Sequence, residues 1–485
     1  MLAEAEAYGR LTLDAHRRVL GAEHRMTLET MQNLGAVFRR TGKYADAETL
    51  LRQTLQTAIS LPDQDEKFIM TVQNGLAIVL KYQDKFSEVE RLYLSILARQ
   101  ERKLPTDHPH ILTTKKNLAD FYLLQGRLEE AESLLRKTWE ALQHVVGPDH
   151  PDTLSVVNSL ASLLRTQGNL GEAEELFTRV LEARRRMLGE DHPDTMTSMH
   201  NLASFLKDKG DPEKAEAMFR RLLSLRRAKL GPDHPGVLNT MNNLASLLKE
   251  GQDRSGAESL YRDVLDAYRR AENEDSGKAQ TVRHNLACVL HDQGKDDQDT
   301  EKLEEAARYY VQGIDYYKRK FGEEHLRTTG MKFALAKLLA DMGDDTRAAE
   351  LHREVLETRR ERWPGRAPDI ARSLFELGDI FLRLGDAVKA ETWLRESLAI
   401  RRKHYAAGDY RTANAKNALG ASLASQGRFE EAESLLVESL PIIESRYTAE
   451  GARTTTAKRR LAELYHAWGK PEKAPDDRPE FPRPD

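Results

Sequence analysis

Apolar residues recur along the chain at intervals of three or four positions, which is the spacing of one face of an α-helix. In residues 152–167 the apolar set is Val156, Val157, Leu160, Leu163 and Leu164. In residues 172–188 it is Ala173, Leu176, Phe177, Val180 and Leu181. Gly168 lies between the two segments, and glycine readily adopts the left-handed conformation found at helix ends. The pattern predicts two antiparallel helices joined by a short turn.

This two-helix pattern returns with a period of 42 residues, which is the mark of a repeat protein. A glycine ends the first predicted helix at Gly42, Gly126, Gly168, Gly210, Gly294, Gly343, Gly385, Gly427 and Gly469. Asp84 and Gln252 occupy the same position in two further copies. The interval from Gly42 to Gly469 is 427 residues, or ten periods plus seven, so an insert of seven residues is expected near 295–302. Most copies also carry a small residue five positions after the glycine, where two helix backbones can approach closely.

The repeat resembles the tetratricopeptide repeat in its 42-residue, kinesin-light-chain-like form. The matching Leu-Gly or Leu-Ala pairs are Leu34-Gly35, Leu118-Ala119, Leu160-Ala161, Leu202-Ala203, Leu244-Ala245, Leu286-Ala287, Leu377-Gly378 and Leu419-Gly420. The resemblance covers about residues 3–470 and implies an all-α fold, a right-handed α-solenoid (superhelix) of stacked antiparallel helix pairs. We expect one array over residues 1–474, with about eleven helix pairs of which the first and last are incomplete. Residues 475–485 are expected to form a proline-rich, disordered tail.

Composition narrows the class of protein further. The 485 residues include 74 Lys and Arg against 78 Asp and Glu, and a single Cys. This near-neutral charge argues against a nucleic-acid-binding surface, and one cysteine excludes a disulfide framework. No apolar run has the length of a membrane span, and residues 1–8 lack the features of a secretory signal. We therefore expect a cytoplasmic protein that binds neither nucleic acid nor membrane.

Histidine recurs in the link between repeats, at His108, His150, His192 and His234 in the motif D-H-P, and at His24 and His325 with Glu before the histidine and no proline after it. Such a set suggests metal ligands, but neighbouring repeats place their helices 8–10 Å apart. One histidine per repeat therefore cannot converge on an ion that needs bonds of about 2 Å. Proline favours the first position of a helix, so we expect the preceding polar residues to cap the helix start.

By the same resemblance, the first helix of each repeat lines a concave groove. The residues expected to face it in the central repeats are Asn158, Ser162, Arg165, His200, Asn201, Ser204, Lys207, Asn242, Asn243, Ser246, Lys249, His284, Asn285 and His291. Their amides and hydroxyls suit the backbone of an extended peptide, and the basic members suit carboxylates or phosphates on it. Alternatively, Asn and Ser merely tolerate solvent there, or the asparagines support packing between repeats.

We therefore predict a non-enzymatic scaffold that binds a peptide segment of a partner protein, one with acidic residues. Walker, dinucleotide-binding, kinase and G-x-S-x-G motifs do not occur, so no catalytic residue, cofactor or metal is expected. One alternative rests on residues 463–474, ELYHAWGKPEKA, which resemble the ends of repeat arrays attached to bacterial serine/threonine kinases. That likeness implies a sensor or substrate-recruiting region whose catalytic part is absent here. A second alternative is a metal-dependent enzyme that uses His284, Cys288 and His291, which share one helical face.

The last predicted helix has no complete partner. Leu461, Leu464 and Trp468 would then be exposed unless another surface covers them. Solenoids normally end in polar caps, so we expect either a larger assembly or a homo-oligomer formed through the incomplete terminal repeats.

Overall fold

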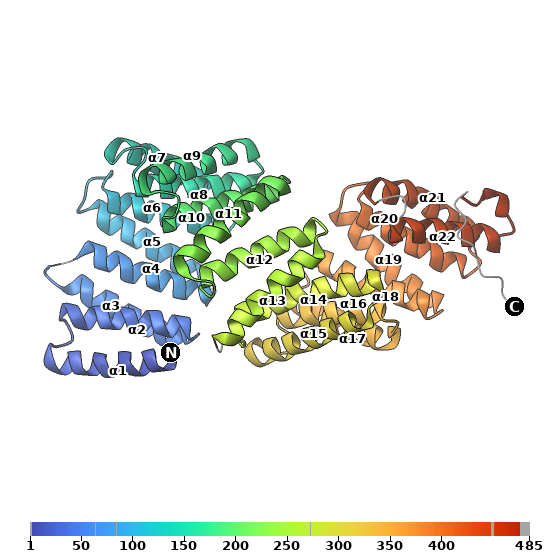
Figure 1. The fold of residues 1–485 in the computed structure, drawn as a ribbon, viewed down its shortest axis with the longest axis horizontal. Coiled ribbons are helices and arrows are strands. Elements are labelled where there is room, and N and C mark those ends of the chain that lie inside the picture. Colours follow the sequence, from blue (N-terminus) through green and yellow to red (C-terminus); the bar gives the residue numbers. More distant parts are fainter. Residues whose placement is uncertain (1, 64, 84, 272, 448–450, 476–485) are drawn as a thin grey trace. The chain divides into compact units, whose positions relative to one another are not determined.

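A computed structural model describes residues 2–63, 65–83, 85–271, 273–447 and 451–475. The helices of these residues are labelled in Figure 1. They are α1 (Leu2–Val19), α2 (Arg25–Arg40), α3 (Tyr44–Ser60), α4 (Glu66–Tyr82), α5 (Phe86–Glu101), α6 (Pro109–Leu124), α7 (Leu128–Val145), α8 (Pro151–Gln167), α9 (Leu170–Leu188), α10 (Pro193–Lys209), α11 (Pro212–Leu230), α12 (Pro235–Glu250), α13 (Arg254–Arg270), α14 (Gly277–Asp297), α15 (Thr300–Phe321), α16 (Leu326–Asp341), α17 (Asp345–Arg362), α18 (Ala367–Arg383), α19 (Ala387–His404), α20 (Tyr410–Ala424), α21 (Phe429–Arg446), α22 (Ala452–Ala467) and a 3₁₀ turn η1 (Pro471–Lys473). The described residues contain no strand, which confirms the all-α class.

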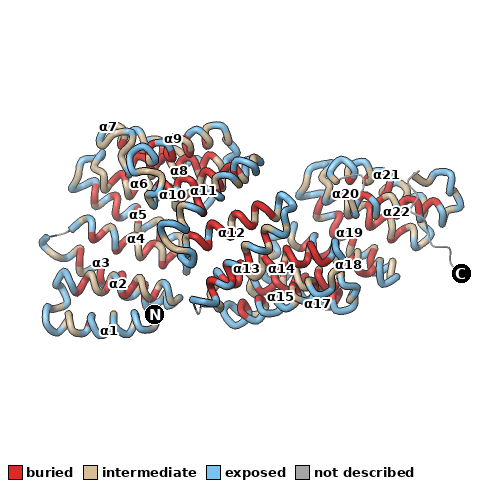
Figure 2. Tube along the Cα trace, in the orientation of Figure 1, coloured by how far each residue is buried: buried red, intermediate tan, exposed pale blue. Residues whose placement is uncertain are grey.

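The chain divides into two compact units, residues 1–229 and 230–485. Within each unit consecutive helices pack against one another as antiparallel pairs, which is the arrangement of an α-solenoid (Figure 1). The even-numbered helices are the first helices of the repeats, and the odd-numbered ones are the second helices. Figure 2 shows that the buried residues form a stripe along each helix, on the side that meets its neighbours. The predicted tail, residues 476–485, lies outside the described residues.

Histidine caps the first helices, as the link motif predicts. At all six link histidines, including His24 and His325 that lie outside the D-H-P motif, the imidazole Nδ1 accepts a hydrogen bond from the backbone N–H two residues later. The donor–acceptor distances are 3.2 Å at His24, His108, His150, His192 and His325, and 3.0 Å at His234. Each bond satisfies one of the amides left without a partner at a helix start. The described links that lack histidine use other caps: Asp65, Ser276 and Asp409 do so with side-chain oxygens, whereas Arg366 provides none.

The glycines after the first helices mostly adopt positive φ, which confirms their predicted role in the turn. Gln252 holds this position between α12 and α13 with φ 69°, although it is not glycine. The prediction for Gly294 was wrong, because α14 continues through it to Asp297 and the chain turns at Gln298 instead, with φ 55°. The seven-residue insert is therefore absorbed largely as helix. Gly294 serves packing, since a Cβ there would lie 2.8 Å from Cγ of Leu303.

Small residues hold the two helices of each repeat close together. The alanines five positions after the turn glycine are completely buried, among them Ala173, Ala257 and Ala390. Gly378 on α18 is packed more tightly still, because an added Cβ would lie 2.4 Å from Cγ of Leu394 on α19. These contacts explain why the repeat keeps small residues at both positions.

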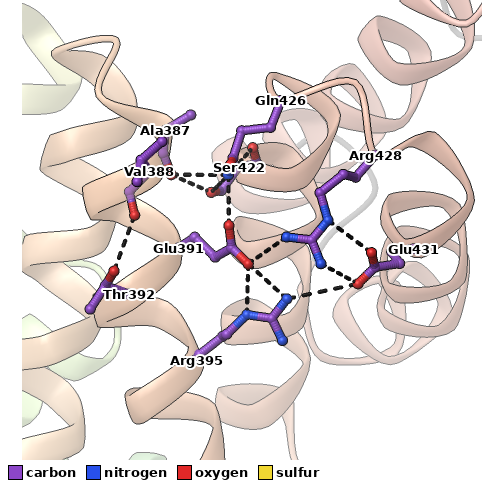
Figure 3. A network of polar contacts seen from close by, with 9 residues as sticks. All are labelled: Ala387, Val388, Glu391, Thr392, Arg395, Ser422, Gln426, Arg428 and Glu431. Atoms are coloured by element: carbon purple, nitrogen blue, oxygen red, sulfur yellow. Dashed lines mark hydrogen bonds and ion pairs between the residues drawn. The ribbon is translucent and has the colours of Figure 1, made fainter.

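Ion pairs tie successive second helices together along their outer faces. Figure 3 shows one such network, centred on Glu391. The Glu391 carboxylate accepts hydrogen bonds from Arg395, Arg428 and Gln426. An equivalent bond, between residues 37 positions apart, joins Arg127 to Glu90 at 2.7 Å. Much of the charge on the second helices is thus neutralised within the protein, as expected for a solvated face.

The first helix of the last repeat, α22, is more deeply buried than the sequence suggests. Leu461 and Leu464 on α22 are 6% and 0% exposed and belong to the apolar core of the C-terminal unit. Phe429 stacks on Trp468 with ring centroids 5.7 Å apart, and the Lys470 ammonium lies 3.3 Å from the centre of the indole ring. The expectation that α22 leaves these leucines exposed is wrong, so they provide no surface for a homo-oligomer.

Candidate functional site: the face of the first helices

The first helices of neighbouring repeats meet to form a continuous face. In the C-terminal unit α12 contacts α14, α14 contacts α16, α16 contacts α18, α18 contacts α20, and α20 contacts α22. The second helices α13, α15, α17, α19 and α21 make no comparable contacts with one another among the described residues. Helices that crowd together lie on the inside of a curved stack, and those that separate lie on the outside. This packing favours the first helices as the inner face of the unit.

The predicted groove residues lie on both units. In the N-terminal unit they are Asn158, Ser162 and Arg165 on α8, with His200, Asn201, Ser204 and Lys207 on α10; all are partly exposed. In the C-terminal unit they are Asn242, Asn243, Ser246 and Lys249 on α12, with His284, Asn285 and His291 on α14. These are also partly exposed, except His291, which is buried at 6% exposure. Since the apolar residues between them are buried, the polar positions face one common side of each helix.

Asparagines on this face bond across the repeat boundary. The amide of Asn201 donates to the side-chain oxygen of Asn158 at 2.8 Å, and that of Asn285 donates to Asn242 at 3.1 Å. Asn117 and Asn74 form the same bond, 3.0 Å long, between α6 and α4. In each case the two residues are 43 positions apart. The asparagines therefore support packing between repeats, as one of the alternatives proposed.

Two of the predicted basic residues also meet a carboxylate of the next repeat. A guanidinium nitrogen of Arg165 lies 3.5 Å from a carboxylate oxygen of Asp208, and Nζ of Lys249 lies 3.7 Å from a carboxylate oxygen of Asp292. Both contacts are long and partly exposed, so each contributes less than about 1 kcal/mol. Arg165 and Lys249 are thus only weakly neutralised within the protein.

His284, Cys288 and His291 do not converge on one point. Nε2 of His284 lies 3.8 Å from Sγ of Cys288, to which the hydroxyl of Tyr310 also donates at 3.4 Å. Burial raises the pKa of the Cys288 thiol, but His284, Lys249 and Tyr310 together outweigh it through hydrogen bonds and charge, and the net pKa is lowered. His291 instead pairs with Asp341 at 2.9 Å. Within the described part of the chain no three candidate ligands are grouped to hold a metal ion, so the proposed metal site is not formed.

Sequence reasoning missed two cavities on the same face in the C-terminal unit. The first, which we call the Arg372 cavity, has a volume of about 380 Å³, and its lining includes Arg372, Glu376 and Tyr405. The second, the Lys337 cavity, has a volume of about 360 Å³, and its lining includes Lys337 and Arg460. Phe375, Glu376, Asn414 and Arg453 line both cavities, which therefore adjoin.

The two cavities lie where the asparagine pairing is interrupted. Glu376 holds the position of Asn201 and Asn285, but the residue 43 positions before it is Phe333, which has no hydrogen-bonding side chain. Within the described residues the Glu376 carboxylate has no hydrogen-bond or ion-pair partner. Burial raises the pKa of this carboxyl, against the opposing effect of Lys337. The register of the repeat could have revealed the site, because Phe and Glu replace Asn or His there.

Comparison with known proteins identifies the repeat. A model of the tetratricopeptide repeat matches residues 1–60, 68–144, 110–186, 152–227, 194–270, 328–403 and 411–475. No curated protein sequence matches the chain. Among the described residues, none of the helices combines the length and the apolar character needed to cross a membrane.

Solved structures of other repeat proteins resemble parts of this chain. The quorum sensor NprR from B. thuringiensis, in its apo form, is 15% identical over 78% of this chain and 99% of its own, with a TM-score of 0.53. The apo form of RapI is 14% identical over 78% of this chain and 98% of its own, with a TM-score of 0.50. A putative kinesin light chain from Podosopora anserina, with TPR-like repeats, is 24% identical over 41% of this chain and 94% of its own, with a TM-score of 0.37.

Proposed function

Because this chain belongs to the tetratricopeptide repeat family, we propose that it is a non-enzymatic scaffold that holds an extended peptide segment of a partner protein on its first helices. The observation that carries this proposal is the row of partly exposed polar side chains on α8 and α10 in one unit and on α12 and α14 in the other. A peptide backbone carries one donor and one acceptor at nearly every residue. A row of amides and hydroxyls at regular intervals can satisfy both.

The bonds between asparagines leave capacity for such a ligand. An asparagine side chain has two N–H donors and an oxygen that accepts two hydrogen bonds. The bond from Asn201 to Asn158 uses one donor of the first and one acceptor site of the second. The remaining donors and acceptors are held in a fixed orientation by that bond. Support of packing and recognition of a peptide are therefore compatible roles for the same residues.

The basic row points to acidic residues on the partner. Lys207 and Lys249 lie at equivalent positions on α10 and α12. The contact of Lys249 with Asp292 is 3.7 Å long and partly exposed, so a carboxylate of a ligand can compete for the ammonium group at small cost. We propose that this row selects peptides that carry Asp or Glu.

The test begins with the selection of peptides from a random library displayed on phage, using the full chain as bait. The affinity of a selected peptide is then measured for the wild type and for the double variant Lys207→Glu, Lys249→Glu. We expect the variant to bind about tenfold more weakly, because at the lysine that contacts the peptide, in either unit, an attraction becomes a repulsion, each worth roughly 0.5–1 kcal/mol. The selected peptides should also be enriched in Asp and Glu.

The matched control reverses two cations on second helices, Arg220→Glu on α11 and Arg269→Glu on α13. Both side chains are exposed, at 57% and 67%, and each pairs with a carboxylate on its own helix. This control should bind the peptide as the wild type does. An equal loss of affinity in the control, or peptides without acidic residues, would refute the proposal.

A further inference from the structure

The walls of the Arg372 and Lys337 cavities hold charges of both signs. Asp341 and Asp379 are paired with cations of the same walls, whereas Glu376, Lys337, Arg372 and Arg453 form no ion pair among the described residues. Glu376 lies on the shared wall, without a hydrogen bond or ion pair to any described residue. Lys337 and Arg372 are likewise without an ion-pair partner among the described residues. The Arg372 guanidinium lies over the ring of Phe333, 4.4 Å from its centre. Arg453 donates to the hydroxyl of Tyr447 at 2.6 Å rather than to a carboxylate.

A buried cation adds to the positive charge of the Arg372 cavity. Arg401 is 6% exposed, donates to the backbone oxygen of Arg411, and lies over the ring of Phe375. The described residues include no carboxylate paired with it. Burial lowers the pKa of Arg401 to about 10, which still leaves it charged at neutral pH. Buried charges without partners are costly to the fold, so a ligand that neutralises them gains affinity.

These charges restrict the chemistry of a ligand. A simple anion would satisfy Arg372 and Arg453 but would meet the carboxylate of Glu376. A simple cation would satisfy Glu376 but would be repelled by the arginines and by Lys337. Only a ligand that carries both an anionic group and a cationic N–H donor, a few bonds apart, satisfies the whole wall.

We propose that the adjoining cavities bind a zwitterionic amino-acid group, with its ammonium group on Glu376 and its carboxylate on Arg372 and Arg453. Volumes of about 380 and 360 Å³ lie within the range of small-molecule sites and accommodate one or two amino-acid residues. The zwitterion can come from a free amino acid or from the amino end of a peptide that begins with an acidic residue. This site lies mainly on α16, α18, α20 and α22, with Arg401 from α19. It adjoins the polar row of the proposed function at α14, where His291 pairs with the wall residue Asp341, but it contains neither Lys207 nor Lys249.

Isothermal titration calorimetry on the full chain tests this proposal with four small probes. Free glutamate is the zwitterion, N-acetylglutamate and glutarate lack the ammonium group, and putrescine lacks the carboxylates. We expect glutamate to bind at least tenfold more tightly than each of the other three. Glu-Ala-Ala amide then distinguishes the two sources, since tighter binding than glutamate indicates the amino end of a peptide and weaker binding indicates a free amino acid.

Variants assign the two ends of the ligand. Glu376→Gln should weaken glutamate at least tenfold but strengthen glutarate, which no longer meets a carboxylate, whereas Arg372→Gln should weaken both. Thermal unfolding of each variant checks that it folds. The Lys207→Glu, Lys249→Glu variant should bind glutamate as the wild type does, so failure of the proposed peptide function and failure of this site are distinguishable. Absence of glutamate binding to the wild type, or equal binding of glutamate and glutarate, would overturn the proposal.

Discussion

A buried histidine in the C-terminal unit should make the fold sensitive to mild acid. His352 on α17 is 0% exposed, and neither of its ring nitrogens has a hydrogen-bond partner. Phe333 packs against it edge-on, with ring centroids 5.0 Å apart. Burial, with added repulsion from Arg359, Arg372, Arg383 and Lys337, lowers the pKa of His352 to about 3.

The sign and size of the effect follow from this lowered pKa. The unfolded chain has a histidine pKa of about 6.5, so it takes up the proton first as the pH falls. The stability associated with neutral His352 is therefore present above pH 6.5 and is lost progressively toward pH 3. Protonation of this histidine in the unfolded chain therefore lowers the free energy of unfolding by roughly 2 kcal/mol between pH 7 and pH 5, since one pH unit is worth about 1.36 kcal/mol for a group that titrates fully.

The variant His352→Leu removes the titrating group and keeps an apolar side chain against Phe333. We expect its free energy of unfolding, measured by urea denaturation and circular dichroism, to fall less between pH 7 and pH 5 than that of the wild type, by about 2 kcal/mol. His404→Leu is the control, because His404 is exposed on α19, and it should show the same loss as the wild type. If His352→Leu loses as much stability as the wild type, the reasoning about this buried imidazole is wrong.

Four further substitutions test the packing, the turns and the thiol. Gly378→Ala should destabilise the fold by roughly 1–3 kcal/mol, because the added Cβ overlaps Leu394. Gly330→Ala on α16, where the added Cβ meets no atom within 4 Å, should stabilise it by about 0.5–1 kcal/mol. Melting temperatures that shift in the same direction for both variants would contradict this account. Gln252→Gly should raise the stability by up to about 1 kcal/mol, because Gln252 has a φ of 69°, which is unfavourable for residues other than glycine. A lower melting temperature would contradict this prediction. Iodoacetamide at pH 7 should alkylate Cys288, the single cysteine, at least threefold more slowly in His284→Ala than in the wild type. The reason is that the His284 imidazole lowers the pKa of the thiol, and the thiolate is the reactive form. An unchanged or faster rate would contradict this role of His284.

The repeat made much of the fold predictable. Its period fixes the ends of the helices, the turn glycines and the buried alanines, because each copy must meet its neighbours in the same way. The role of His24 and its equivalents followed from the helix start alone, since a polar residue before the first turn has free amides to bond.

The remaining features depend on departures from the period. Gly294 could not be separated from the turn glycines by spacing, because its role is set by contact with Leu303 across the repeat. Burial of Leu461 depends on how closely α22 approaches α20 and α21, which no local pattern specifies. The cavities around Glu376 lie where Phe333 and Glu376 replace the two asparagines that bond at three other repeat boundaries. At that boundary the departure of Phe333 and Glu376 from the repeat, and not the repeat itself, indicates the site.

The central claim, that the first helices form a peptide-docking face, is tested most directly by photo-crosslinking. A peptide selected from the library would carry a diazirine, and the residues it labels on the full chain would be identified by mass spectrometry after digestion. We predict labels on residues 151–167 or 193–209 in the N-terminal unit, or on residues 235–250 or 277–297 in the C-terminal unit. Labels confined to the second helices, such as residues 170–188 or 254–270, would contradict it.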